Sequence, residues 1–347
     1  MKKGGVFLLA VALALLGAGV SRAETMDQLY QKAKGEGALL FYSGGPVEPY
    51  ERWAKEFMEK FPGIAVKVEG GFSNVLDSKI NQQIAAKKME VDMALLQTVQ
   101  DYVAWKKEGA LIRFRPEGAE KIDKRFRDKD ETFWPTSVVL LSYAYNTNAL
   151  KPNEVPKSAL DFLKPQFAGK IVTAYPADDD ATLFVFNDIV KKYGWGYMKK
   201  YMANKPNFIQ GHLGELKSIA DGTNAVTFDA TNSTTGALKK AGQPIEFAFP
   251  ASDPMPTFFI TAGIFKGAPH PNAAKLFLTW YLAKEQQSRT GSFSARTDVP
   301  PPPGLKPLSS YKIDAGYQKL VTDKNIAALR KRFEEYTGPV VNKGGVR

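Results

Sequence analysis

Short apolar runs alternate with amphipathic helical patterns through most of the chain, and this alternation constrains the fold more than any other feature. Early in the chain, residues 37–43, 64–71 and 91–97 are typical of strands, and each is followed by a helical pattern. The run VDMALLQ at 91–97 is continuously apolar, as in a strand buried on both faces. Strands and helices in this order predict a parallel sheet covered by helices, so we expect an α/β fold.

The same order restarts in the second half of the chain. Residues 169–176 and 225–229 are strand-like, with helical patterns at 178–194 and 214–222. Two long apolar segments without a preceding helix would carry the chain between the halves, which predicts two Rossmann-like lobes with a ligand cleft between them. The expected bounds are 1–23 for a signal peptide, 24–137 plus 263–305 for lobe one, 138–257 plus 306–347 for lobe two, and 135–141 and 255–262 for the crossovers.

The start of the chain has the pattern of a secretory signal peptide. Lys2 and Lys3 precede an apolar run, and Ser21 and Ala23 are small residues suited to cleavage after Ala23. The alternative, a membrane anchor, needs about 20 apolar residues, and this run weakens from Gly17 onward. The sequence has no cysteine, hence no site for a lipid anchor on an N-terminal cysteine. We therefore expect an exported protein that diffuses freely in the periplasm.

The charge balance is basic. The formal net charge is +11, and loss of residues 1–23 would leave 44 basic and 36 acidic residues. Nucleic acid is the usual partner for such a balance. Export argues against it, and the segments KRFRDKDE and LRKRFEE mix both signs, as solvated helix faces do. We expect no nucleic-acid partner, and an anionic ligand fits the balance better.

Small polar residues stand where predicted strands meet predicted helices. They are Ser43-Gly44-Gly45, Ser73-Asn74, Gln97-Thr98 and the turn from Ala177 to Thr182. In an open α/β sheet such junctions gather at the carboxyl ends of the strands. Free N–H groups and the helix dipole there favour anions, and glycine permits close approach. One junction alone indicates little because every helix needs a cap, but four facing one cleft predict a binding site.

The familiar enzyme signatures are missing from the sequence. The glycines at 44 and 45 fit neither a nucleotide loop nor a dinucleotide fingerprint, and neither G-x-S-x-G nor H-E-x-x-H occurs. His270 precedes a helical pattern, and we expect it to be exposed. His212 either lines the cleft or caps a helix. A hydrolase would have to combine His212 with a serine and an acid, and no local signature supports this.

Two further groups of side chains allow two interpretations each. Asp178-Asp179-Asp180 can bind a cation or an amine, but carboxylates at a helix start are favourable through the helix dipole alone. Tyr143 and Tyr145 share one face of a predicted strand, where they either line the cleft or hinge, or pack in the core.

The chain resembles the periplasmic solute-binding proteins of ATP-driven importers, in the two-lobed class with two crossovers that includes ferric-iron, phosphonate, sugar-phosphate and thiamine binders. The resemblance covers nearly all of residues 24–340. It rests on GALLFYSGG, FMEKFPGIAVKV, VDMALLQ, SYAYNTN and the block FKGAPHPNAAKLFLTWYLAKEQQ. It implies a type II periplasmic binding fold, whose lobes close on a ligand and present it to a membrane permease.

The resemblance also implies a cleft lined by the strand-to-helix junctions and by the loop after residue 228. Ferric-binding relatives hold iron with adjacent tyrosines in that loop, but residues 228–235 contain none, and hydroxyls and amides are poor ferric ligands. Asp229 and the Asp178 cluster leave carboxylates that could still serve a metal. The ligand-binding residues that we expect are Ser43, Gly44, Ser73, Gln97, Thr98, Tyr143, Asp178, Thr182, His212, Asp229, Thr231 and Phe258.

The sequence thus predicts a monomeric periplasmic solute-binding protein for a small anionic organic molecule, such as a carboxylate, phosphate or phosphonate. Tyr143, Phe258 and Phe259 leave room for the organic body of such a solute. Two alternatives remain open: a binder of ferric iron or a ferric complex, and a secreted enzyme that uses His212 with Asp178 or Asp229 as acid and base. We expect an ABC permease in the inner membrane as the partner, and neither a cofactor, a metal site nor catalytic residues.

Overall fold

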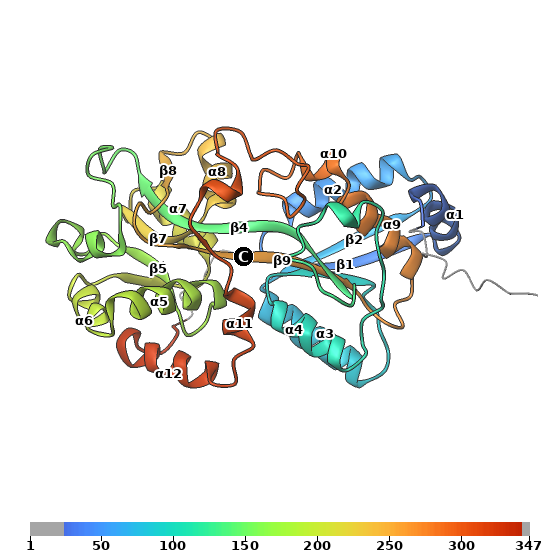
Figure 1. The fold of residues 1–347 in the computed structure, drawn as a ribbon, viewed down its shortest axis with the longest axis horizontal. Coiled ribbons are helices and arrows are strands. Elements are labelled where there is room, and N and C mark those ends of the chain that lie inside the picture. The colour runs from blue at the N-terminus through green and yellow to red at the C-terminus, as the bar shows by residue number, and fades with distance from the viewer. Residues whose placement is uncertain (1–23, 342–347) are drawn as a thin grey trace, which may run out of the picture.

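Two long antiparallel strands, β4 (Phe133–Asn146) and β9 (Met255–Ile264), run side by side through the middle of the molecule and connect two groups of elements (Figure 1). The computed structural model describes residues 24–341. The predicted signal peptide and its cleavage site lie outside these residues. Within them, no helix combines the length and the apolar character needed to cross a bilayer.

Lobe one, as we call the group on the right of Figure 1, is built on three parallel strands in the order β2-β1-β3. Apolar side chains at helical spacing bury one face of the covering helices, as Trp53, Ala54 and Phe57 do in α2. Its elements are β1 (Ala38–Gly44), β2 (Ala65–Gly71), β3 (Met93–Leu96), α1 (Met26–Glu36), α2 (Glu48–Lys60), α3 (Ser73–Ala85), α4 (Val99–Lys107), α9 (Pro271–Tyr281) and α10 (Lys284–Gln287).

Lobe two, on the left of Figure 1, holds four shorter strands. β5 and β6 pair in parallel, whereas β7 and β8 pair antiparallel with β4. Helix α5 is buried along most of its length because α6, α11 and strands β7 and β9 pack around it. The elements of lobe two are β5 (Val172–Ala174), β6 (Asn207–Ile209), β7 (Val226–Thr231), β8 (Ile245–Ala248), α5 (Asp180–Tyr193), α6 (Gly196–Ala203), α7 (His212–Ala220) and α8 (Asn232–Lys240).

One mixed sheet continues through both lobes, in the order β2-β1-β3-β9-β4-β7. The predicted parallel arrangement holds for β1, β2 and β3. It does not hold for β4 and β9, because these connecting segments are themselves sheet strands that run antiparallel to their neighbours. The β4–β9 register shifts between Pro135 and Ser137, at a proline that has no N–H to donate to the ladder.

The C-terminal part of the chain returns across the junction of the lobes. The apolar pattern of residues 272–291 is typical of a single helix, but the chain leaves helical geometry at Ala283, and the Leu282 carbonyl accepts instead from Arg296 Nη1 at 3.1 Å. Beyond it lie β10 (Ile313–Asp314), which pairs with β9, then α11 (Tyr317–Val321) and α12 (Ile326–Thr337). Short 3-10 turns complete the fold: η1 (Ala119–Lys121), η2 (Ala159–Leu163), η3 (Pro165–Phe167) and η4 (Leu308–Ser310).

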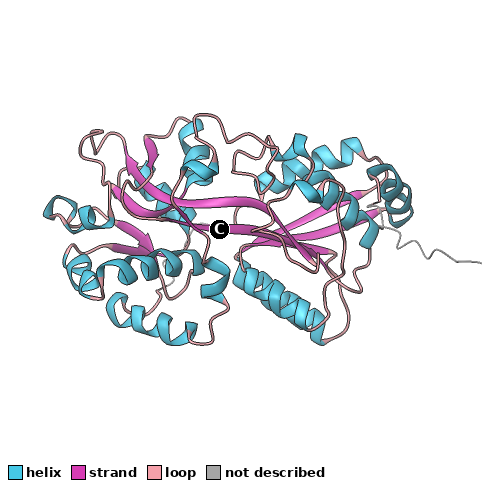
Figure 2. Ribbon diagram, viewed as in Figure 1, coloured by secondary structure: helices cyan, strands magenta, loops and turns pink. Residues whose placement is uncertain are grey.

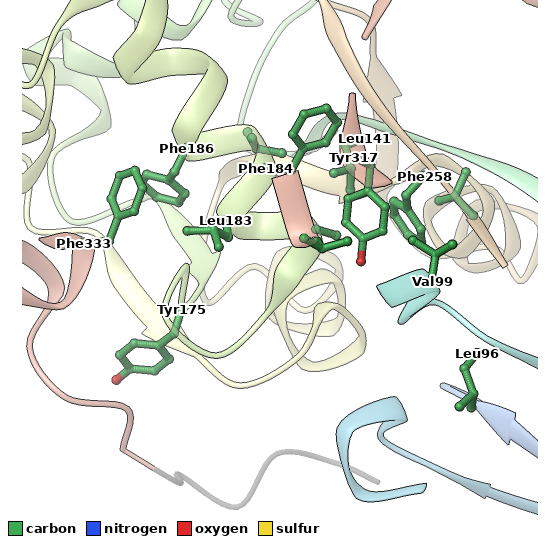
Figure 3. Packing of buried hydrophobic residues seen from close by; sticks show 14 of the residues in the cluster. Leu96, Val99, Leu141, Tyr175, Leu183, Phe184, Phe186, Phe258, Tyr317 and Phe333 are labelled. Atoms are coloured by element: carbon green, nitrogen blue, oxygen red, sulfur yellow. The ribbon is translucent and has the colours of Figure 1, made fainter. Parts of the chain in front are cut away.

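A hydrophobic core runs through both lobes without interruption. Helices cover both sides of the strands (Figure 2), and one buried cluster reaches from Leu96 and Val99 in lobe one to Phe186 in lobe two. Figure 3 shows Tyr317 and Phe258 lying between these two ends of the cluster, with ring centroids 5.5 Å apart. The two aromatic rings therefore form part of the core at the junction of the lobes.

Candidate functional site

A cavity lies between the lobes, where four strands end. Lobe one contributes residues 72–74 after β2 and residues 97 and 98 after β3. Lobe two contributes residues 178–180 after β5 and residues 210 and 211 after β6. Ligands in open α/β folds bind at the carboxyl ends of strands, so the position of the cavity makes it the candidate site.

The lobe-one wall presents backbone donors. Helices α3 and α4 begin here, and their N-cap residues Phe72 and Thr98 make no side-chain capping bond. Within residues 24–341, the N–H groups of Ser73 and Asn74 find no acceptor, as is usual in the first turn of a helix. The backbone N–H of Gln97 donates to Ser73 Oγ at 3.4 Å, and this bond connects the start of α3 to the segment just before α4. This wall therefore offers donors and the positive end of two helix dipoles.

Gly44, which was predicted to allow a ligand to approach the backbone, instead allows a protein side chain to do so. A Cβ on Gly44 would lie 2.3 Å from Ser73 Oγ, so β1 and α3 pack closely only because residue 44 is glycine. Neighbouring Ser43 is fully buried, and its hydroxyl has no partner within the described residues. Neither Ser43 nor Gly44 is among the residues that line the cavity.

Three aspartates form much of the lobe-two wall. Asp178 accepts from Gln210 Nε2 at 3.0 Å. Asp179 caps α5 by accepting from the amides of residues 181 and 182 at 2.8 and 2.9 Å. Asp180 pairs with Arg330. Helix capping is therefore the role of Asp179, while Asp178 remains available to a ligand.

A buried ion pair stands behind this wall. His212 Nε2 lies 3.4 Å from Asp179 Oδ1, and its Nδ1 lies 3.2 Å from Glu215 Oε2. Burial disfavours the charged form of both groups, but the attraction between them is stronger than this effect of burial. The imidazolium therefore lowers the pKa of Asp179, and the carboxylates of Asp179 and Glu215 raise the pKa of His212. His212, at the start of α7 beside the cavity, is thus held as the cation that compensates Asp179.

Direct contacts already join the two walls. Gln100 Nε2 donates to Asp180 Oδ2 at 2.8 Å, and Gln97 Nε2 lies 3.5 Å from Asp179 Oδ2. A Cβ on Gly211 would lie 3.2 Å from the ring of Phe72, so glycine at 211 allows the lobes to meet there. The lobes therefore contact each other around the cavity.

One set of side chains has the spacing of a metal site. Ligand atoms of His212, Glu215 and Asp229 all lie within 4.8 Å of one another. Asp229 already accepts from Thr227 Oγ1 at 2.6 Å and Thr182 Oγ1 at 3.0 Å, and burial raises the pKa of Glu215. Hydroxyl groups of lobe two therefore already occupy both oxygens of Asp229, one of the three potential ligands.

The predicted site residues divide into two sets. Ser73, Gln97, Thr98 and Asp178 line the cavity. Those outside it are Ser43, Gly44, Tyr143, Thr182, His212, Asp229, Thr231 and Phe258.

The predicted aromatic lining lies in the core instead. Phe258 packs on Tyr317. Tyr143 donates to Asp253 Oδ2 at 3.2 Å and lines a second cavity inside lobe two. His270, predicted to be exposed, is partly covered, because its amide and Nδ1 both bond the buried carboxylate of Asp92.

Sequence reasoning missed three lining residues. Phe72 follows β2, and Gln210 and Gly211 follow β6. The signal available for them was position, since each stands between a strand end and a helix start. β6 is only three residues long, so its end was hard to recognise.

Comparison with known proteins places these features in a family context. Residues 52–318 match the family model described as bacterial extracellular solute-binding protein. An uncharacterized protein of Haemophilus influenzae is 24% identical over 296 residues, which cover 80% of each chain. A probable ABC transporter periplasmic-binding protein of Sinorhizobium fredii is 24% identical over 192 residues, 51% of each chain.

Solved structures of similar fold cover most of the chain. Iron-bound HitA from Pseudomonas aeruginosa has a TM-score of 0.72 and 19% identity, covering 85% of this chain and 99% of its own. The periplasmic binding protein AfuA from Actinobacillus pleuropneumoniae, with fructose-6-phosphate bound, has a TM-score of 0.70 and 19% identity, covering 86% and 98%. At this identity the likeness shows a shared fold, that of type II periplasmic binding proteins.

Proposed function

The chain belongs to the bacterial extracellular solute-binding proteins, the periplasmic components of ABC transporters, and we propose that it captures a small anionic organic solute between its lobes. The solute carries a carboxylate, phosphate or phosphonate group. Closure of the lobes retains the solute for delivery to an inner-membrane permease. The protein acts as a monomer after cleavage of the signal peptide at Ala23, with the lobe bounds predicted from the sequence.

The observation that carries this proposal is the lobe-one wall. Two helices, α3 and α4, begin at the cavity without side-chain caps, and the N–H groups of Ser73 and Asn74 find no acceptor within the described residues. Helix starts of this kind bind anions through open N–H groups and the helix dipole. Gln97 and Ser73 add polar side chains beside them.

Ferric iron is the second candidate, and the three carboxylates of residues 178–180 favour it. Hard cations prefer oxygen ligands. Asp179 and Asp180 are, however, engaged with His212 and Arg330. That leaves Asp178 as the carboxylate of the wall without a cationic partner in residues 24–341, which is too few anionic ligands for Fe³⁺.

An enzymatic role has less support. His212, the histidine beside the cavity, is held between Asp179 and Glu215. A general base must reach the proton that it removes, and this imidazole has both nitrogens directed at carboxylates. We therefore propose binding without turnover.

Calorimetry and thermal-shift measurements with the mature protein test the proposal. The panel contains carboxylates, phosphates and phosphonates, ferric salts and ferric citrate. We expect saturable 1:1 binding of at least one organic anion and its recovery unchanged by mass spectrometry. Binding of ferric species without binding of any organic anion, or conversion of the bound molecule, would overturn the proposal.

A further inference from the structure

The cavity wall in lobe two has one carboxylate that the protein leaves without a counter-ion. Asp179 lies 3.4 Å from the imidazole of His212, and Asp180 pairs with the guanidinium of Arg330. Asp178 accepts only from the neutral amide of Gln210, and no Lys, Arg or His in residues 24–341 lies within ion-pair distance of it. The wall therefore carries one unpaired negative charge.

The cavity has no basic side chain to receive an anion. Its ten lining residues include three aspartates, two glutamine side chains and an asparagine, but neither lysine nor arginine. An anionic solute lying against Asp178 would meet repulsion inside a partly enclosed space, where charges interact more strongly than in water. The anionic end of the solute must therefore lie toward lobe one.

The lobe-one wall is complementary to such an arrangement. Its open N–H groups at Ser73 and Asn74 are donors, and the hydroxyl of Thr98, whose residue is only 3% exposed, has no partner within the described chain. A buried hydroxyl without a partner costs free energy, so it gains from an acceptor on the solute. The lobe-two wall is therefore complementary to a cationic group and the lobe-one wall to an anionic group of the same ligand.

We propose that the solute is a small zwitterion, with an anionic group bound at the starts of α3 and α4 and an ammonium group bound to Asp178. This inference rests on the proposed function and sharpens the class of solute. Pairing Asp178 with an ammonium group removes the unpaired charge when the lobes enclose the ligand. Phe72, 40% exposed and part of the lining, offers an apolar surface to the carbon chain between the two groups.

Matched pairs of probes test the zwitterion directly. One series contains ω-amino carboxylates and ω-aminoalkyl phosphonates of increasing chain length, and the other contains the same acids without the amine. We expect at least one zwitterion to bind about 10- to 100-fold more tightly than its deamino partner, the range expected for a charge-assisted hydrogen bond. Equal affinity within every pair, or no binding by any zwitterion, would overturn the inference.

Asp178→Asn identifies the group responsible. This variant keeps the shape and the bond to Gln210 but removes the charge, so zwitterion affinity falls about 10- to 100-fold while affinity for the deamino acid does not fall. Asp221→Asn is the matched control, because Asp221 is an exposed aspartate of lobe two outside the cavity, and it leaves both affinities unchanged. If Asp178→Asn weakens both probes equally, the ammonium contact is excluded.

The outcomes separate this inference from the proposed function. If deamino anions bind as tightly as zwitterions, the protein binds anions as proposed, but the ammonium group has no role in recognition. Amines that bind without any anionic group remove the anionic function as well. Circular dichroism and thermal unfolding of both variants check that they fold, because affinity is compared only between folded proteins.

Discussion

Gln100 donates a hydrogen bond to Asp180 at 2.8 Å, and this bond joins α4 of lobe one to α5 of lobe two beside the cavity. Asp180 also binds Arg330 from α12, so three separate parts of the chain meet at one carboxylate. A bond of this kind exists only while the lobes are together. It provides a way to test whether closure contributes to affinity.

Gln100→Ala removes that bond by a change at a residue that does not itself line the cavity. A hydrogen bond to a charged group stabilises the state that contains it by about 1.5–3 kcal/mol. Because water replaces part of this bond when the lobes open, we expect solute affinity to fall about 3- to 10-fold. Calorimetry measures the affinity and small-angle X-ray scattering the compactness. Gln243→Ala, at an exposed site of lobe two, is the control. Wild-type affinity in Gln100→Ala would show that closure does not depend on this contact.

Tyr317 provides a second link between the lobes. Its hydroxyl donates to the carbonyl of Gln97 at 3.3 Å, and its ring packs on Phe184 and Phe258. Tyr317→Phe should lower the free energy of unfolding by about 0.5–1.5 kcal/mol, and Tyr317→Ala by about 3–5 kcal/mol. Urea denaturation followed by fluorescence measures both. Equal losses in the two variants would contradict a packing role for the ring.

Gly44 is tested by a rescue. Gly44→Ala would place a Cβ 2.3 Å from Ser73 Oγ, and overpacking of this kind costs about 1–3 kcal/mol. Adding Ser73→Ala removes the clashing oxygen and should recover most of the loss. Gly35→Ala in α1, where a Cβ meets no atom within 4 Å, should instead stabilise the protein by about 0.5–1 kcal/mol. Failure of the double variant to recover would mean that the strain lies in the backbone.

Asp188 should make stability depend on pH. Burial and the neighbouring Asp314 raise the pKa of Asp188 to about 7. The folded state therefore holds a proton that the unfolded state, with a pKa of about 3.9, releases, so the free energy of unfolding falls as pH rises from about 4 to about 7.

Asp188→Asn should remove that loss. We expect it to stabilise the protein by about 1–3 kcal/mol at pH 8 and to have little effect at pH 4, since one pKa unit corresponds to about 1.4 kcal/mol. Asp161→Asn is the contrasting control, because Lys164 and the neighbouring amides, acting against burial, lower the pKa of Asp161, and its loss should destabilise at neutral pH. Denaturant titrations from pH 4 to 8 distinguish the two, and parallel curves for wild type and Asp188→Asn would contradict the assignment.

Much of the fold was predictable because local patterns determine it. The strands near 37–43 and 64–71 and the helix between them follow from period-2 and period-3.6 spacing of apolar residues. Strand direction was not predictable for β4 and β9, because an apolar run looks the same whether its neighbours are parallel or antiparallel. At the break near Ala283, the Leu282 carbonyl accepts from Arg296, a contact that the local sequence does not predict.

The site was predictable where it depends on position in the chain and not where it depends on side-chain direction. Ser73, Gln97 and Asp178 follow strands, so their place at the cavity follows from topology. Tyr143 and Phe258 lie on strands buried on both faces, where sequence alternation cannot tell a cleft from a core. The charge on Asp178 stands out only once Asp179 and Asp180 are seen to be paired with distant residues.

A crystal structure of the mature protein with its bound solute, either co-purified or selected from the probe series, tests zwitterion binding between the lobes directly. We predict one small molecule between the lobes, with its anionic group at the amides of Ser73 and Asn74 and its ammonium group within hydrogen-bond distance of Asp178. A solute bound elsewhere, for example in the cavity beside Tyr143, or bound between the lobes with an anionic group against Asp178, would contradict this binding mode.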